Sequence, residues 1–413
     1  MKKTTLLITR LLLYLFSASL ALGTWNPFVN SLTYNGGKFD NVNYLAQVIS
    51  ALFIGSLFLF PKSNNRVKTY YIIELSLLFV ILLFSTLIYS EDTLSQGTIL
   101  YFIKLALDFA LCMFLPRLFN SQNNYLNQSI LIFSILCAII ASLFSLGLLN
   151  DFIFISQGRI FFAGENPNST SGRFVLAFIF IIHLIIKNPF NWGRLRHLMW
   201  LLLPPIFNMI MASGSRGSFI ILLICIPSYL IYAPTKGVIN RIIFLLLAPI
   251  IIYQLSIYYI SKNQNYSIFE RLNYSIESGS DSNRGQLILE SFEIFKDYPI
   301  IGAGTIKYQE EMLLRYNESR IAHNLFVYLL AVSGIIGFLL FTVFVLKVLK
   351  KAFFIRFYEP LAFTLFLYFF FLSSKTGGIL TYILMWYVFA IITSYYNQFI
   401  LSQQEEIIEY DNE

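Results

Sequence analysis

The dominant feature of the sequence is a series of long apolar runs separated by short polar segments. About 20 consecutive apolar residues are enough for a helix to cross the hydrocarbon core of a bilayer. Charged residues make up 12% of the 413 residues and apolar residues 57%, whereas about 25% of the residues of an ordinary soluble domain are charged. This composition excludes a soluble enzyme and a disordered chain, and it predicts an all-α polytopic membrane protein.

We predict about twelve membrane-spanning helices in a single transmembrane domain over residues 1–398, followed by an acidic tail over 399–413. The predicted spans are residues 5–23, 42–60, 69–89, 97–115, 126–149, 172–187, 198–212, 217–233, 241–260, 323–345, 359–373 and 378–398. A long connection, residues 261–322, separates the ninth span from the tenth. Connections of this length inside a compact domain are usually functional.

Lysine and arginine residues indicate the orientation of these spans, because they gather in the cytoplasmic loops of membrane proteins. With the N-terminus inside, the inner segments carry 15 basic residues and the short outer segments carry five. We therefore place both termini in the cytoplasm and loop 261–322 outside. The net charge of +7 follows from the same bias and does not indicate a nucleic-acid partner. The first run resembles a signal peptide, but we expect it to be retained as a helix, since the other spans then obey the charge rule.

The long loop contains a predicted helix over residues 284–297. Ile288, Phe292 and Phe295 fall on one of its faces, and its polar residues fall largely on the other. Pro299 follows the helix as a stop signal. We expect this amphipathic helix to lie flat on the membrane or over the mouth of a cavity. Residues 150–171 form a second long outer connection.

Charged residues inside an apolar run are costly, so Lys104 and Asp108 in the fourth span need an explanation. They are four residues apart and can therefore pair on one helix face. Two interpretations remain open, a self-neutralised structural pair and a relay for protons or ions. The three cysteines lie inside apolar runs without metal-ligand spacing, so neither a disulfide framework nor a zinc site is predicted.

Three outer positions carry groups that suit an anionic substrate. Arg216 lies in the short connection SGSRGSF, whose glycines allow close approach of a ligand. Arg284 opens the loop helix, where it opposes the helix dipole unless an anion lies between them. His323 begins the tenth span and can accept a proton near pH 7. Each also has a plain structural interpretation, as a turn arginine, a solvated arginine or a capping histidine.

The other outer connection adds Arg159 and the turn GENPN over residues 164–168. Asn166 and Asn168 can hydrogen-bond sugar hydroxyls, although Asn-Pro-Asn is also ordinary turn chemistry. Planar guanidinium groups bind a diphosphate bidentately, and a lipid-linked diphosphate would place its head at this depth. The sequence has no carboxylate pair at the outer rim and no Gly-rich nucleotide loop, so we expect no metal, nucleotide or other cofactor.

Several strings of this region resemble the O-antigen ligase and polymerase superfamily of bacterial membrane glycosyltransferases. They are SGSRGSF at 213–219, NRGQLILESFEIFKDYPIIGAG at 283–304, HNLFVYLLAVSGIIGFLLF at 323–341 and RIFFAGENPN at 159–168. The resemblance implies a GT-C-like fold in the inner membrane and a glycan donor linked to undecaprenyl diphosphate. It implies that Arg216 and Arg284 hold the diphosphate and that His323 assists the attack of an acceptor hydroxyl, without metal and with inversion. Asn324, the second residue of the His-Asn motif, joins the substrate-binding candidates.

Two activities of this superfamily fit the sequence. A polymerase joins one lipid-linked repeat unit to another, whereas a ligase moves a finished chain onto lipid A-core. The His-Asn motif continues with Leu325 and Phe326 and lacks a further serine, which favours the polymerase. The expected partners are the lipid-linked oligosaccharide, an acceptor glycan, membrane lipid and a chain-length regulator. A lipid-linked oligosaccharide flippase, with Lys104 and Asp108 as its relay, is the alternative from another class.

Overall fold

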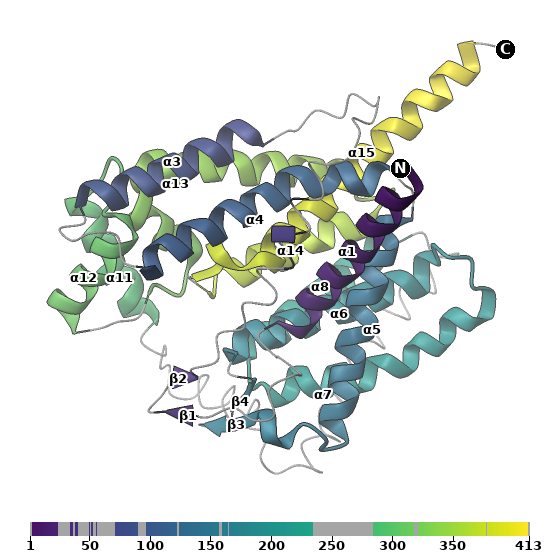
Figure 1. The fold of residues 1–413 in the computed structure, drawn as a ribbon, viewed down its shortest axis with the longest axis horizontal. Helices are drawn as coiled ribbons and strands as arrows, with labels where there is room; N and C mark the ends of the chain where they lie inside the picture. The colour runs from purple at the N-terminus through teal and green to yellow at the C-terminus, as the bar shows by residue number, and fades with distance from the viewer. Residues whose placement is uncertain are drawn as a thin grey trace. The chain divides into compact units, whose positions relative to one another are not determined.

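The computed structural model describes residues 2–23, 71–89, 96–121, 124–156, 159–163, 165–233, 284–317, 321–376 and 378–411, together with a few positions between 34 and 55. These residues are almost all helical (Figure 1). The predicted spans 42–60 and 241–260 lie largely or wholly outside the described residues, as do residues 261–283 of the long loop.

The described helices make the chain a polytopic all-α membrane protein. Seven of them are long and apolar enough to cross a membrane, namely Ile72–Tyr89, Gly97–Asn120, Tyr125–Ser145, Pro167–Lys187, Gly193–Ala212, Leu325–Phe354 and Ile383–Gln404. Three shorter apolar helices are Leu7–Leu22, Arg216–Tyr232 and Pro360–Ser373. Together these helices overlap ten of the predicted spans.

The chain divides into two compact units. Unit 1 comprises Met1–Pro61, Phe119–Ser278 and Ile355–Tyr368, and unit 2 comprises Lys62–Leu118, Gly279–Phe354 and Phe369–Glu413. The helices α4 (Gln96–Ser121) and α14 (Pro360–Ser373) contribute residues to both.

Unit 1 is built around α6 (Pro167–Lys187), which is buried along almost its whole length. The helices α5 (Tyr125–Ser145), α7 (Leu203–Ala212) and α8 (Arg216–Tyr232) pack against α6, and α1 (Lys2–Leu22) packs against α5. A 3₁₀ helix, η2 (Gly193–Leu202), leads directly into α7. Asn166 and Pro167 supply the cap and first position that start α6 five residues before its predicted beginning.

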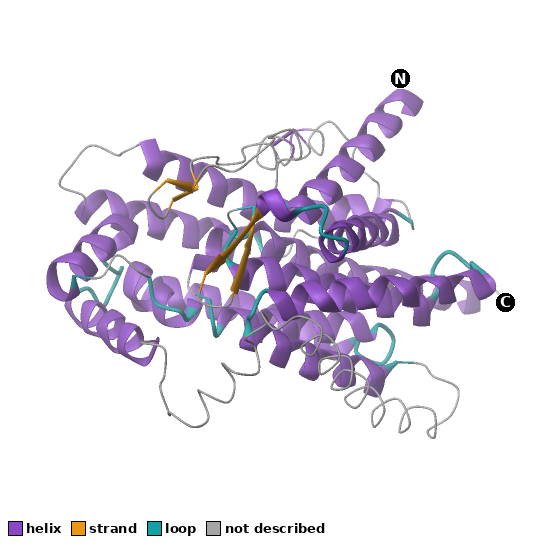
Figure 2. Cartoon of the chain, turned by 90° about the horizontal axis from the view of Figure 1, so that it is seen from below, coloured by secondary structure: helices purple, strands orange, loops and turns teal. Residues whose placement is uncertain are grey.

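A short antiparallel hairpin precedes α6, in the stretch predicted as a plain outer connection (Figure 2). Its strands are β3 (Ile153–Ser156) and β4 (Arg159–Phe162), and Ser156 is paired with Arg159. Isoleucine and phenylalanine on these strands favour extended backbone. A second hairpin, β1 (Tyr34–Asn35) and β2 (Lys38–Phe39), lies in the same unit. The first hairpin delivers Arg159 to the beginning of α6.

In unit 2, α3 (Ile72–Tyr89) runs beside α13 (Leu325–Phe354), and α15 (Ile383–Asp411) also packs against α13 (Figure 1). The 3₁₀ helix η3 (Gly378–Thr381) precedes α15. The core between these helices is aromatic: the ring centroid of Phe344 lies 4.9 Å from those of Tyr71 and Phe389. The helices α11 (Arg284–Asp297) and α12 (Gly304–Tyr316) form a pair against α3 and α13.

The helix α13 is interrupted at Gly334, whose φ of 61° and ψ of −168° are not helical. The backbone of the α11–α12 connection replaces the lost helical hydrogen bonds. Ile335 donates its N–H to the carbonyl of Pro299 (2.9 Å), and Ala303 donates its N–H to the carbonyl of Ala331 (2.9 Å). An interrupted helix is tolerated within a membrane protein when other protein groups satisfy its backbone. This connection therefore fixes α11 and α12 on α13.

Several charged residues occupy places that the sequence did not indicate. The structure describes both Lys104 and Asp108, yet forms no ion pair between them, and Asp108 is buried with Oδ2 unbonded within the described part of the chain. Lys351, one of the 15 basic residues counted in the inner segments, lies buried within α13 with Nζ 4.4 Å from the ring centre of Tyr71. The acidic tail continues the helix α15 as far as Asp411.

Candidate functional site

In unit 1, the turn before α6 brings the predicted substrate-binding asparagines to the start of that helix. Asn166 is the N-cap, and its Oδ1 accepts a hydrogen bond from the backbone N–H of Asn168 (2.9 Å). Asn168 lies in the first turn, buried, whereas Asn166 is exposed. Gly164 of the GENPN turn lies outside the described residues.

Asn168 joins three segments of unit 1. Its Oδ1 accepts hydrogen bonds from Nη2 of Arg159 on β4 and from Oγ of Ser215, both at 2.9 Å. Ser215 is the N-cap residue of α8, which begins at Arg216. The structure thus brings Arg159, Asn168 and the first turn of α8 together within unit 1.

Two helix N-termini therefore lie side by side at this place. A hydroxyl network joins them, since Ser218 of α8 lies 2.5 Å from Ser171 of α6 and 3.1 Å from Ser215. Helix N-termini carry partial positive charge and free N–H groups. With Arg159 and Arg216 beside them, they make this end of unit 1 strongly electropositive, which favours an anionic ligand.

A buried ion pair that sequence reasoning missed supports the same turn. Arg173, one of the five basic residues counted in the short outer segments, is buried in the second turn of α6 and pairs with Glu165. Glu165 also accepts a hydrogen bond from Thr170 (3.0 Å), and Arg173 donates to the carbonyl of Ala21 at the end of α1 (3.0 Å). Glu165 and Arg173 are eight residues apart, so no helical spacing indicated the pair.

In unit 2, α11 begins at Arg284 and ends at Asp297, as predicted. Its buried face is different from the apolar face found in the sequence: Leu287, Glu290, Ser291 and Ile294 are buried. Phe292, by contrast, is 43% exposed. The carboxylate of Glu290 accepts a hydrogen bond from Gln286 (2.7 Å), and its Oε2 has no further partner among the described residues.

The residues before α13 hold His323 between two fixed neighbours. The backbone N–H of Ala322 donates to the hydroxyl of Tyr308 on α12 (3.0 Å). On the other side, Oδ1 of Asn324 accepts from the N–H groups of Phe326 (3.0 Å) and Val327 (3.2 Å) and so caps α13. His323 itself is half-buried.

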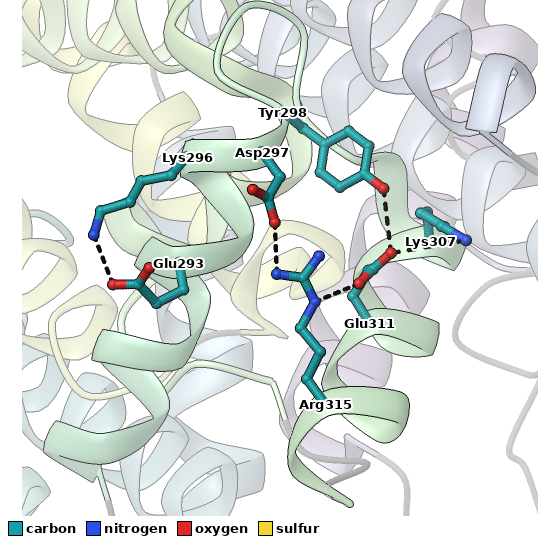
Figure 3. A network of polar contacts seen from close by, with 7 residues as sticks. All are labelled: Glu293, Lys296, Asp297, Tyr298, Lys307, Glu311 and Arg315. Atoms are coloured by element: carbon teal, nitrogen blue, oxygen red, sulfur yellow. Dashed lines mark hydrogen bonds and ion pairs between the residues drawn. The ribbon is translucent and has the colours of Figure 1, made fainter.

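The exposed side of the α11–α12 pair carries an ionic network (Figure 3). Arg315 lies 2.5 Å from both Asp297 and Glu311, and Tyr298 donates its hydroxyl to Glu311 (3.2 Å). The hydrogen bond to Asp297 raises the pKa of Arg315, and burial together with Glu311 raises the pKa of Tyr298. This network joins the end of α11 to α12. The helix α12, which sequence reasoning missed, is only 13 residues long and has charged residues among its apolar ones, so it gives no span-like run.

The glycines of the PIIGAG string are required by the packing of this connection. Gly302 and Gly304 have φ values of 76° and 75°. A Cβ at Gly302 would overlap the backbone of Val332 and Ser333, and a Cβ at Gly304 would overlap α3 at Ser85 and Thr86. Thr305 then donates its N–H to Oγ1 of Thr86 (3.1 Å).

Arg216 thus belongs to unit 1, and Arg284, His323 and Asn324 belong to unit 2. No three His, Cys, Asp or Glu side chains gather as metal ligands anywhere in the described ranges.

Residues 197–342 match the family model for O-antigen ligase. This match supports membership in the O-antigen ligase and polymerase superfamily. This domain covers about a third of the chain and contains Arg216, Arg284, His323 and Asn324, whereas Arg159 and the GENPN turn precede it. No curated protein and no solved structure matches the chain. The match supports a membrane glycosyltransferase-type role in polysaccharide assembly.

Proposed function

We propose that this protein is a surface-polysaccharide polymerase of the bacterial inner membrane. It transfers a glycan from undecaprenyl diphosphate to a hydroxyl of another lipid-linked repeat unit on the outer face. The observation that carries the proposal is the O-antigen ligase domain, which contains both predicted diphosphate-binding arginines and the predicted base within one matched region. The electropositive end of unit 1 and the double anchoring of His323 support the same assignment.

In the proposed reaction, Arg216 and Arg284 bind the diphosphate of the donor. Guanidinium groups bind phosphate oxygens bidentately, and they stabilise the charge that develops on the leaving diphosphate. Each arginine begins a helix, so the helix N-terminus adds to the positive potential. The two arginines supply the neutralising charge that a metal ion supplies in other phosphate-transfer sites.

His323 accepts the proton of the acceptor hydroxyl as its oxygen attacks the anomeric carbon. A new bond forms between the acceptor oxygen and this carbon, and the bond from the carbon to the phosphate oxygen breaks. The bonding electron pair leaves with undecaprenyl diphosphate. Attack from the face opposite the leaving group inverts the anomeric configuration, so one displacement completes the transfer.

The asparagines suit the recognition of sugar hydroxyls. Asn166, Asn168 and Asn324 each use the side-chain oxygen for a hydrogen bond within the protein. This leaves the amide NH₂ groups to donate to hydroxyl oxygens of a glycan. Arg159, which is fixed by Asn168, adds a cation to this surface.

The second candidate is an O-antigen ligase that transfers the finished chain to lipid A-core, and the family's description favours it. The Leu325-Phe326 continuation of the His-Asn motif favours the polymerase. The two activities predict different cells after gene deletion. Without a polymerase the core lipid carries single repeat units, whereas without a ligase it carries none. A flippase deletion would instead leave no repeat units on the outer face.

The decisive experiment is complementation of a deletion strain with Arg216→Ala, Arg284→Ala and His323→Ala, with Arg194→Ala as an exposed control. Protein amount is measured by immunoblot, and polysaccharide chain length by gel. We expect all three site variants to lose long chains at an unchanged protein amount and the control to keep them. Normal chain length in the three site variants would reject the proposal.

A further inference from the structure

We infer that Tyr308 is a positioning residue that holds His323 in place and couples it to the helix begun by Arg284. The inference rests on the proposed function, because it assigns a role to the surroundings of its proposed base. The Tyr308 hydroxyl lies between Ala322, which precedes His323, and Ser291 of α11. The same hydroxyl thus links the segment before α13 to both α12 and α11.

The donor and the acceptor of each hydrogen bond in this series, from Ala322 through Tyr308 to Ser291, follow from the groups involved. The backbone N–H of Ala322 can only donate, so the oxygen of Tyr308 accepts (3.0 Å). The hydroxyl of Ser291 donates to the carbonyl of Leu287 (2.6 Å), and it therefore accepts from the hydroxyl of Tyr308 (2.8 Å). The hydroxyl groups of Tyr308 and Ser291 thus each donate one hydrogen bond and accept another. Ala322, Tyr308 and Ser291 are all fully buried.

This arrangement restricts His323 from both sides. Ala322 is held by Tyr308, and Asn324 is held by its capping bonds to Phe326 and Val327. A single residue between two fixed neighbours has little backbone freedom, so the direction of the Cα–Cβ bond of His323 is set. Without the Tyr308 hydroxyl, the backbone N–H of Ala322 would lose this hydrogen bond.

The phenol itself is fixed independently of His323. Its ring packs edge-on against Tyr328 of α13 at 5.3 Å between centroids. Burial raises the pKa of Tyr308, so its hydroxyl stays protonated at physiological pH and keeps donating to Ser291. With no exposed surface, it is suited to positioning and not to contact with substrate.

The helix α12 does not depend on this hydroxyl for its place in the fold. Its first turn is held on α3 by the bonds between Thr305 and Thr86, and its last turn on α11 by the bonds of Arg315. Tyr308→Phe keeps the ring and its packing, and removes only the hydroxyl. We therefore expect this variant to fold while His323 loses its alignment.

The test uses the full chain in lipid nanodiscs, with Tyr308→Phe and Ser291→Ala as variants and Tyr316→Phe as control. Tyr316 lies on the same helix and has no hydrogen bond through its hydroxyl to the residues that the structure describes. Binding of undecaprenyl diphosphate gives the fraction of folded sites, and kcat and KM are then measured with the lipid-linked repeat unit.

We expect Tyr308→Phe to lower kcat on the order of 100-fold, since small misplacements of a reacting group have effects of this size. Ser291→Ala should lower it by about 10-fold. Binding stoichiometry and KM should stay within about twofold of the control, because only a step after donor binding is affected.

The inference is overturned if kcat of Tyr308→Phe equals that of the control, or if the variant loses binding stoichiometry together with activity, which would make Tyr308 a folding residue. These outcomes are distinct from a failure of the proposed function. If His323→Ala remains fully active, the proposed base is wrong, whatever Tyr308→Phe does.

Discussion

Gly302 and Gly334 lie backbone against backbone, and a Cβ on either residue would overlap the chain segment of the other. Both have positive φ values, 76° and 61°. The contact inserts the α11–α12 connection into the interruption of α13. It thereby sets the position of the two helices that carry Arg284 and anchor His323.

Replacement of Gly334 by alanine should therefore disrupt this insertion. Positive φ costs an L-residue about 1–2 kcal/mol, and forcing an atom into a filled site adds about 1–3 kcal/mol. Gly193→Ala is the matched control, because Gly193 has a φ of 55° but open space where a Cβ would be. We expect Gly334→Ala to lower the unfolding temperature, measured in detergent by tryptophan fluorescence, far more than Gly193→Ala. Equal shifts would contradict the close contact.

Loss of Glu165 should destabilise unit 1, since it would leave Arg173 as an unpaired buried charge. Removing one partner of a buried ion pair costs about 3–5 kcal/mol, whereas exposed pairs contribute at most about 1 kcal/mol. Glu293→Gln is the control, because Glu293 forms an exposed pair with Lys296. We expect Glu165→Gln to lower thermal stability strongly and Arg173→Met to recover part of the loss in the double variant. A Glu165→Gln protein as stable as Glu293→Gln would refute the buried pair.

Local sequence signals predicted the limits of the helix 284–297 but not the beginning of α6. The helix 284–297 was predicted with the observed ends, because Pro299 follows it. Which face it buries depends on its partners, and the contact with Tyr308 buries Ser291 while Phe292 stays exposed. Tertiary packing thus overrode the apolar periodicity. The earlier start of α6 was within reach of the sequence, since Asn166 and Pro167 are a strong start signal.

The candidate site was only partly accessible from sequence. Arg159, Asn168 and Arg216 were singled out by residue type and location, but the link through Ser215 was not predicted. Tyr308 carried no such signal, because one tyrosine among 26 is unremarkable until folding places it beside Ala322. Glu165 and Arg173 were missed for the same reason.

Asn168→Asp separates the structural role of this residue from its proposed role in binding. The aspartate oxygen can still accept from Arg159 and Ser215, so the fold should be kept. Its negative charge at the joined helix N-termini opposes an anionic donor, and it removes the NH₂ donor. We expect the KM for the lipid-linked donor to rise about 10-fold, with Asn191→Asp, on an exposed turn, as control. Unchanged donor affinity would argue against an anion beside Asn168.

Arg284→Lys tests whether a planar fork, and not merely positive charge, is required. Lysine keeps the charge but cannot bind two phosphate oxygens in the bidentate arrangement. We expect transfer activity to fall by about 10-fold or more in a nanodisc assay, while the same change at the exposed Arg194 has no effect. An Arg284→Lys enzyme of full activity would restrict Arg284 to a long-range electrostatic role.

The pH dependence of thermal stability should show the contribution of the Tyr308 hydroxyl and its loss when the hydroxyl ionises. Burial raises its pKa in the folded protein above the value of about 10 expected in the unfolded chain. A raised pKa means that the folded state holds the proton more tightly, so the stabilisation is complete below pH 10 and is lost as the pH rises towards the folded value. The difference in unfolding temperature between the wild type and Tyr308→Phe should be constant from pH 7 to about 9 and shrink above about 10. Tyr298, whose pKa is also raised, is present in both proteins and cancels. A difference that shrinks below pH 9 would show that another group is responsible.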